Sequence, residues 1–340
     1  MKIVTIGGGT GSFNLLSGLK KYPADITAIV TMADDGGSTG RLRDELGVLP
    51  PGDVRQCLVA LSDSSDLLRE LMNYRFERGG LKGHNFGNLL LSALEKIEGS
   101  FSKGAEEAAE ILRVRGAVVP VSEEKMNLFI KLKNKKLIRG ESQLDHNKNV
   151  RKYGIEKVYL KPNAKAYKKA IDSIMKADMV VIGPGDHYGS IIPNLLVKGI
   201  PEALQKTRAV IIYVCNLTNK KGQTENYDLD DYAGEINKYI GKNMISYVIS
   251  GTKNPDRGLI KIYEEKEGKG SLVLFDPDKG IRRSYKVVKA DVLSEKRVSK
   301  NKNDFIASTR SFIRHDSDNL AKVIMELSEI EKKKLIKKII

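Results

Sequence analysis

The sequence MKIVTIGGGTG at residues 1–11 predicts a strand, a tight turn and the start of a helix. Lys2–Ile6 is a short apolar run rich in β-branched side chains, which indicates a buried strand. Ser12–Lys20 places its large apolar side chains on one helical face. Between them stand Gly7, Gly8, Gly9, Thr10 and Gly11. Because glycines let a phosphate approach the backbone and the first N–H groups of a helix point at it, we predict a phosphate-binding turn.

A second glycine-rich loop, Ala33–Gly40, follows the next predicted strand, Ile26–Met32. An acidic residue at this place would hold a ribose hydroxyl. As a pair, Asp34 and Asp35 would instead offer their carboxylates to a Mg²⁺ ion. The other candidate ligand contacts in and after this loop are Gly36, Gly37, Ser38 and Arg41.

The first glycine turn departs from the dinucleotide-binding fingerprint G-x-G-x-x-G. Counted from Gly7 or from Gly9, the third glycine position is held by Ser12 or by Asn14. This departure disfavours a nicotinamide-dependent enzyme. A glycine turn needed only for strand–helix packing is the alternative, and the second glycine loop favours a nucleotide site over it.

Two further segments carry candidate ligands near predicted helix starts. PPGD at residues 50–53 precedes the helix expected at Val54–Leu61. Asp53 either caps that helix or faces a metal or hydroxyl, and Arg55 would contact phosphate. Residues 83–88, GHNFGN, open a strongly apolar helix, where small glycines favour binding over a purely structural role. The candidates there are His84, Asn85 and Asn88.

The strand-then-loop pattern recurs later in the chain. Met179–Ile182 predicts a buried strand, and Ala209–Cys215 predicts another that is closed by Asn216. The loop after the first of these contains Gly183, Pro184 and Gly185. Strands alternating with helices predict an α/β fold with a doubly wound, mainly parallel sheet. Ligands bind beyond the carboxyl ends of such strands, so these loops converge on one composite nucleotide cleft.

The carboxy-terminal part is predicted to be a smaller α+β extension. Met244–Ser250 predicts the last apolar strand of the series, and the clearest boundary follows near Lys253–Gly258. We therefore expect a nucleotide-binding domain at 1–252 and an extension at 253–340 that folds back on the cleft, or one continuous domain. The expected elements are a charged turn, an edge strand and a final helix, at Glu264–Gly270, Ser271–Phe275 and Asp318–Ile340.

The composition is that of a charged globular chain without membrane or disulfide signals. The 340 residues are 41% hydrophobic, and no apolar run approaches the ~20 residues of a membrane span. The two cysteines suggest a reducing cytoplasm. Net charge is +15, and Lys131–Lys169 holds 13 Lys and Arg against 3 Asp and Glu, a net of +10. Since this stretch has few aromatics, a solvated lysine-rich surface is favoured over nucleic-acid binding.

Eight blocks of sequence give the chain a family resemblance. They are GGGTG (7–11), DDGGSTGRLR (34–43), PPGDVR (50–55), GHNFGNLLL (83–91), VIGPG (181–185), SIIPNLLVKGIPEAL (190–204), CNLT (215–218) and RHD (314–316). On these blocks the chain resembles the YvcK-like branch of the CofD family, whose members are often labelled gluconeogenesis factors. One loop departs from the family pattern, which usually reads Ser-Leu-Tyr-Thr where residues 186–189 read Asp-His-Tyr-Gly. The Lys/Ile-rich tail is an apparent extension.

The resemblance implies a Rossmann-like fold, a homo-oligomer such as a dimer, and a bacterial cytoplasmic location. YvcK-like proteins are associated with UDP-sugars such as UDP-N-acetylglucosamine, and with cell shape, cell-wall synthesis and growth on gluconeogenic carbon sources. CofD itself is a 2-phospho-L-lactate transferase that uses a nucleotide-activated donor, a metal and a deazaflavin acceptor. Because the chain resembles the first branch, we expect a UDP-sugar-binding regulator without efficient transferase activity, and the transferase remains the alternative.

The motif RHDS at residues 314–317 allows two interpretations. In the first, Asp316 or Ser317 caps the final helix and Arg314 is solvated. In the second, the segment folds back and the planar guanidinium of Arg314 contacts the diphosphate, with Arg41 and Arg55 as further cations. We prefer the second, because the glycine turn supplies no cation. Ser317 would then be a site for a kinase, since added phosphate would compete for Arg314.

Overall fold

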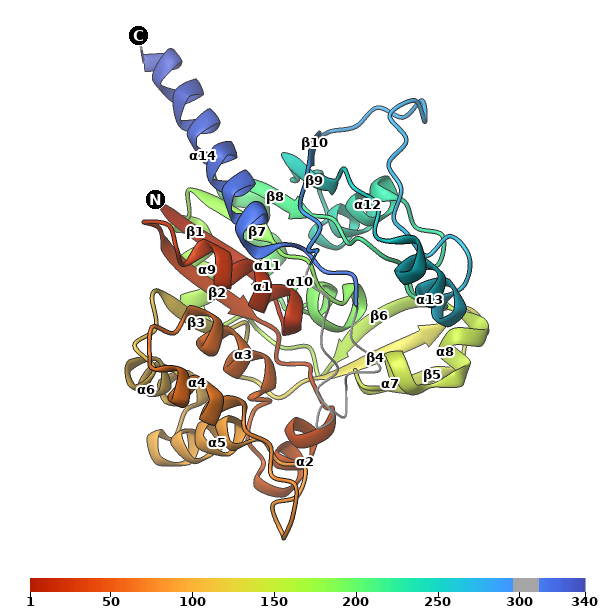
Figure 1. The fold of residues 1–340 in the computed structure, drawn as a ribbon. Helices are drawn as coiled ribbons and strands as arrows, with labels where there is room; N and C mark the ends of the chain where they lie inside the picture. The colour runs from red at the N-terminus through yellow and green to blue at the C-terminus, as the bar shows by residue number, and fades with distance from the viewer. Residues whose placement is uncertain (296–311, 340) are drawn as a thin grey trace.

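The centre of the molecule is a parallel sheet that winds in two directions. The computed structural model describes residues 1–295 and 312–339. Seven strands lie in the order β10-β9-β8-β7-β1-β2-β3, and all neighbouring pairs are parallel (Figure 1). They are β1 Lys2–Gly7, β2 Asp25–Val30, β3 Ala117–Pro120, β7 Met179–Ile182, β8 Val210–Val214, β9 Tyr247–Gly251 and β10 Lys286–Ala290. The sheet is doubly wound as predicted, and its order reverses between β1 and β7.

The central strands are buried on both faces. Every residue of β7 is buried, and so is every residue of β1 after Lys2. Continuous apolar strands of this kind are typical of parallel sheets that carry helices on both sides. The strands predicted from the runs Lys2–Ile6 and Met179–Ile182 are confirmed.

Helices cover the two faces of this sheet. Right-handed crossovers put the helices between β1 and β3 on the face opposite to those between β7 and β9. The first group is α1 Gly9–Leu19, α2 Gly37–Leu46, α3 Gly52–Leu61, α4 Asp66–Asn73, α5 Phe86–Glu98 and α6 Phe101–Ile111. The second side carries α9 Lys168–Lys176, the π-helical turn η1 His187–Ile191, α10 Ile192–Leu195, α11 Ile200–Lys206 and α12 Leu229–Ile240. Helix α14, Ser317–Ile339, packs on α1 (Figure 1).

A small antiparallel sheet is inserted between β3 and α9. Its order is β5-β4-β6, and it is joined by two short helices. The elements are β4 Asn127–Leu132, β5 Leu137–Arg139, α7 Gln143–His146, α8 Lys148–Tyr153 and β6 Ile155–Lys161. The basic stretch Lys131–Lys169 therefore belongs mainly to this insertion. Buried Leu128, Ile130 and Leu160 attach it to the main core.

Three local predictions are wrong. Residues predicted as the charged turn Glu264–Gly270 largely belong to α13, Arg257–Glu267, whose start is capped by the Asp256 carboxylate. The segment Ser271–Phe275 forms only one isolated bridge, because its backbone bonds the loop at 217–219 instead of the sheet edge. The glycine loop Ala33–Gly40 is shorter than predicted, since α2 begins at Gly37.

The carboxy-terminal segment contacts the main sheet and its helices. β10 pairs in parallel with β9 and forms the sheet edge, a strand that the short sequence KVVKA did not reveal. The predicted final helix is confirmed as α14. It lies so close to α1 that a Cβ added at Gly18 would be 1.9 Å from the carbonyl oxygen of Ser317. The division into 1–252 and 253–340 stays a prediction.

Candidate functional site

A cavity of about 600 Å³ lies at the carboxyl ends of β1 and β7. Its wall includes the turn after β1, the loop after β7, and the start of α3. This is the point where the strand order reverses, and in open α/β sheets ligands bind at such a switch point. The fold thus explains why loops far apart in the sequence line one space.

The turn after β1 presents the amino end of α1 to the cavity. Gly8, Gly9, Thr10 and Gly11 line the wall, and no acidic residue occupies the first turn. Gly9 has φ +62°, a conformation that favours glycine. An added Cβ at Gly8 would be 2.3 Å from an Asp53 carboxylate oxygen, and one at Gly11 would be 1.9 Å from the Pro184 carbonyl oxygen. The turn therefore packs closely against the Asp53 carboxylate and the loop after β7, and the amino end of a helix in such a wall favours anions.

The loop after β7 forms the neighbouring wall. The side-chain amide of Asn216 donates to the carbonyl oxygen of Gly185 at 2.8 Å, which fixes this loop against the end of β8. Asn194 donates to the carbonyl oxygen of Gly7 at 3.2 Å and joins the loop to the first turn. Pro184, Gly185 and Asn216 line the cavity, as predicted for a convergent site.

The two predicted metal-binding carboxylates have different local partners. Asp34 accepts a hydrogen bond from the Gly36 N–H at 2.8 Å. Asp35 accepts one from the Ser142 N–H at 2.8 Å, which attaches the small sheet's 140–142 segment to the start of α2. Burial, with the charge of Asp35 in addition, raises the pKa of Asp34. Among residues 1–295 and 312–339, no group of three or more His, Cys, Asp or Glu side chains is arranged to hold a metal.

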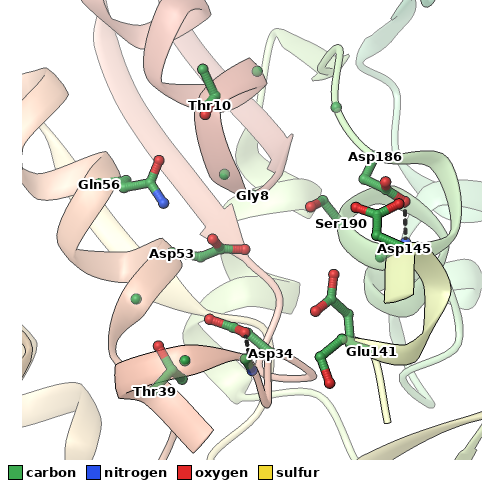
Figure 2. Close-up of a pocket in the computed structure, with 18 of the residues that line it drawn as sticks. Gly8, Thr10, Asp34, Thr39, Asp53, Gln56, Glu141, Asp145, Asp186 and Ser190 are labelled. Carbon is green, nitrogen blue, oxygen red and sulfur yellow. Dashed lines mark hydrogen bonds between the residues drawn. The ribbon is translucent and has the colours of Figure 1, made fainter. Parts of the chain in front are cut away.

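The segment held by Asp35 inserts an unpredicted acid, Glu141, into the cavity (Figure 2). Figure 2 shows its carboxylate between Asp53 and Asp34 on one side and the Asp186 loop on the other. Burial raises the pKa of Glu141 well above its ordinary value, and the charges of Asp34, Asp186, Asp53 and Asp145 raise it further. No local sequence signal marks this residue, because its position depends on the contact between two distant segments.

A second unpredicted group is an ion cluster at the same end of the cavity. The ammonium of Lys220 contacts Asp145 of α7 at 2.8 Å and also pairs with Asp186. Burial alone would lower the pKa of Lys220, but the two carboxylates outweigh it and raise that pKa. Burial opposes ionisation of Asp186, yet Lys220 outweighs burial and lowers the pKa of Asp186. Lys220 and Asp186 are therefore charged at neutral pH, and the Lys220 ammonium pairs with both carboxylates of the cluster.

The carboxy-terminal motif reaches the cavity. Arg314 and His315 line it, while Asp316 caps α14 by accepting from the N–H groups of Asp318 and Asn319. Asp316 thus caps the final helix, as in the first interpretation, and Arg314 lies at the cavity, as in the second. Burial lowers the pKa of His315 to about 4, so its imidazole is neutral. Its buried Nε2 has no hydrogen-bond partner among the described residues.

Other predicted residues fall into two groups. Those that line the cavity are Gly36, Gly37, Ser38, Asp53, Arg55 and Asn88, although Arg55 donates to Asn88 at 2.9 Å and to Asn73. Those outside the lining residues are Gly7, Arg41, His84, Asn85 and Gly183. Asn85 caps α5, and Ser38 lies within hydrogen-bond distance of a ring nitrogen of His84. Burial, with Arg41 nearby, lowers the pKa of His84.

Sequence reasoning also missed several polar lining residues. They are Asn14, Thr39, Gln56, Arg75, Ser142, His146, Ser190 and Thr218. Gln56 follows Arg55 on α3, and Ser190 is the last residue of the predicted loop Gly183–Ser190, although it was not itself named as a ligand contact. A wider window around Arg55 would have included Gln56, whereas Ser142 and His146 depend on the docking of the inserted sheet.

The fold and this cavity define a doubly wound, Rossmann-like α/β protein with its cleft at the switch point. Residues 3–293 match the family model of 2-phospho-L-lactate transferase CofD, and the chain belongs to the CofD family. It is 37% identical over 330 residues to a protein of Bacillus subtilis named gluconeogenesis factor, covering 96% of this chain and 98% of the relative. A Halalkalibacterium halodurans protein of the same name is 38% identical over 326 residues, covering 95% of each chain.

A solved structure is similar over almost the whole chain. The crystal structure of a Bacillus halodurans protein has a TM-score of 0.86 to this chain at 36% sequence identity, and it covers 95% of this chain and 98% of its own. The α/β fold class predicted from the sequence is thus confirmed. No helix among residues 1–295 and 312–339 has the length and hydropathy needed to cross a lipid bilayer.

Proposed function

We propose that the cleft binds a UDP-sugar such as UDP-N-acetylglucosamine, and that the protein is a cytoplasmic regulator of cell shape, cell-wall synthesis and growth on gluconeogenic carbon sources. The observation that carries the binding proposal is that the amino end of α1 and Arg314 line the same cavity. Helix N–H groups and a guanidinium are donors of the kind that a diphosphate requires. The gluconeogenesis-factor relatives support the regulatory part.

The alternative is a CofD-type transferase with a nucleotide-activated donor and Mg²⁺. The family match supports it, and Asp34, Asp35 and Asp53 would be the residues that offer oxygens to the metal. A deazaflavin acceptor would need a surface on which its rings stack, but the described lining residues include no Phe or Tyr. Release of GMP from a phospholactyl-nucleotide donor, dependent on such an acceptor, would establish the transferase and replace the regulator.

Regulation by a kinase and assembly into a dimer are further parts of this proposal. Ser317 is the first residue of α14 and lines a second groove together with Lys20 and Lys21. A phosphate on Ser317 would lie at a helix amino end near these cations. It would also stand three residues from Arg314 and compete with the ligand for that guanidinium.

The test of binding is titration calorimetry with UDP-N-acetylglucosamine. Arg314→Ala should weaken binding by roughly 1.5–3 kcal/mol, the range of a hydrogen bond to a charged group, and Arg314→Lys should restore part of it. Gly9→Val should also weaken binding, because its side chain would enter the cavity from a backbone with φ +62°. Arg208→Ala, an exposed arginine away from the cavity, is the control. Wild-type affinity in the Arg314→Ala and Gly9→Val variants would contradict the proposal.

A further inference from the structure

The inserted antiparallel sheet has one buried face and one face that solvent reaches. Leu128, Ile130 and Leu160 are buried against the main core, and the alternate residues of the strands lie on the opposite side. Figure 1 shows this sheet at the periphery of the molecule. We call its solvent side the outer face, and its residues are Asn127, Phe129, Lys131, Leu137, Arg139, Lys157, Tyr159 and Lys161.

Two aromatic side chains lie together in the middle of the outer face. Phe129 is the cross-strand partner of Tyr159 on one side and of Arg139 on the other. The two rings are stacked, with centroids 5.5 Å apart and planes at 19°, and both side chains are only half-buried. The sequence favours a solvated surface because this stretch has few aromatics, but the fold places two of them in contact on one accessible face.

Basic side chains surround this aromatic pair. Arg139, Lys157 and Lys161 are exposed, and no salt bridge found among residues 1–295 and 312–339 involves any of them. Alternate residues of one strand are ~7 Å apart, so Tyr159 has a lysine at about that distance on each side along β6. Arg139 donates to the side-chain oxygen of Asn127 at 3.3 Å, which holds its guanidinium beside the rings.

We propose that the outer face binds a single-stranded nucleic acid, with bases stacked on Phe129 and Tyr159 and phosphates against Arg139, Lys157 and Lys161. Stacking on an aromatic side chain tolerates any base, and adjacent cations neutralise the backbone. A sheet face with accessible rings suits unpaired bases, because the bases of a duplex are already stacked on one another. The inference does not depend on what the cleft binds, since no residue of the outer face lines the cavity.

The charges and apolar side chains of the outer face favour this partner over an anionic membrane. Glu156, the acid of β6, already pairs with Lys131 and Lys135, so it does not oppose a polyanion. Peripheral membrane binding requires several large apolar side chains that enter the lipid. The outer face offers one exposed aliphatic side chain, Leu137, and its two rings are half-buried among charged neighbours.

The test is fluorescence anisotropy with labelled single strands of about 12 nucleotides, within the site sizes of such proteins. Oligo-uridine and oligo-thymidine should both bind more tightly than a DNA duplex of the same length. The tighter of the two single strands identifies whether the natural partner is RNA or DNA. Vesicles of phosphatidylserine and phosphatidylcholine provide the membrane arm.

Matched variants separate stacking from charge. Tyr159→Leu removes the ring and should weaken single-strand binding about five-fold or more, whereas Tyr159→Phe should bind like the wild type. Lys157→Gln combined with Lys161→Gln should reduce the slope of log affinity against log salt by about 1.4, since each phosphate contact contributes about 0.7. Lys96→Gln combined with Lys103→Gln removes the same charge from exposed positions of α5 and α6 and should leave that slope unchanged.

A second measurement does not require removal of the ring. The chain contains no tryptophan, so Tyr159→Trp introduces a single fluorescent reporter on the outer face. Its fluorescence should be quenched by the single strands. UDP-N-acetylglucosamine, whose proposed site is the cleft, should leave it unchanged.

The outcomes that would overturn the inference are distinct from those that concern the cleft. They are equal affinity for single strand and duplex, wild-type affinity in Tyr159→Leu, and a tryptophan at 159 that the oligonucleotides do not quench. Binding of the vesicles without binding of the oligonucleotides would assign the outer face to membranes instead. Calorimetry with UDP-N-acetylglucosamine measures the cleft independently, so either proposal can fail while the other stands.

Discussion

The two walls of the cleft are built by different means. The glycine turn after β1 is a local structure: a strand, the glycines and the helix follow one another within 20 residues. The Glu141 wall is assembled from a distance, because the 140–142 segment belongs to the inserted sheet and is attached to Asp35, 107 positions earlier. A wall built from consecutive residues can be recognised from a sequence motif, and its close contacts tolerate little change in shape. A wall assembled from a distance leaves no motif, and its position depends on a few polar contacts.

The largest effect should come from the local wall. Gly11→Ala puts a Cβ 1.9 Å from the Pro184 carbonyl oxygen and 2.9 Å from Gly185 Cα, and both are backbone atoms that cannot rotate away. We expect a loss of about 3 kcal/mol in the free energy of unfolding, together with loss of ligand binding. Urea denaturation measures the first and calorimetry the second.

Gly234→Ala is the matched control for this change. Gly234 is inside α12 with nothing within 4 Å of an added Cβ, so alanine should be neutral or stabilising there. A Gly11→Ala protein as stable as the wild type would mean that the first turn can move away from the second loop. The glycine turn after β1 would then be as adjustable as the 140–142 segment.

A smaller effect is expected when the attachment of the distant wall is removed. Asp35→Ala deletes the acceptor for the Ser142 N–H, and we expect a loss of about 1–2 kcal/mol in stability. Hydrogen exchange should show faster exchange at residues 140–146 with little change in α1. Equal protection of that segment in both proteins would show that apolar packing of the inserted sheet, and not Asp35, positions Glu141.

The smallest effect concerns the pH dependence of stability. The pKa of Glu141 is raised in the folded protein, so the folded state binds more protons than the unfolded state above about pH 4.5. Stability should therefore fall as pH rises from there through the folded pKa. Glu141→Gln removes this cost and should raise Tm at pH 8 by roughly 1–3 °C, with less gain at pH 5. An equal change at both pH values would argue against a raised pKa.

The sequence predicted the sheet and the local wall because their signals are short-range. The run Lys2–Ile6 needs only its own apolar side chains to indicate a buried strand. Gly9 indicates a tight turn by its residue type alone, since glycine readily adopts the φ of +62° found there. β10 was missed because KVVKA is too short to show a period and forms an edge. Asp34 and Asp35 looked like a pair in the sequence, yet successive residues point to different partners, and only the folded chain shows that one of them holds the inserted sheet.

The close contact of α14 with α1 links the final helix to the cleft. The two helices are separated by so little space at Gly18 that neither can shift without the other. α1 begins at the glycine turn, and the segment that leads into α14 carries Arg314 to the same cavity. Figure 1 shows α14 extending away from the body of the molecule. A substitution that pushes α14 away from α1 would therefore disturb both the glycine turn and Arg314, although the substituted residue lies outside the cavity.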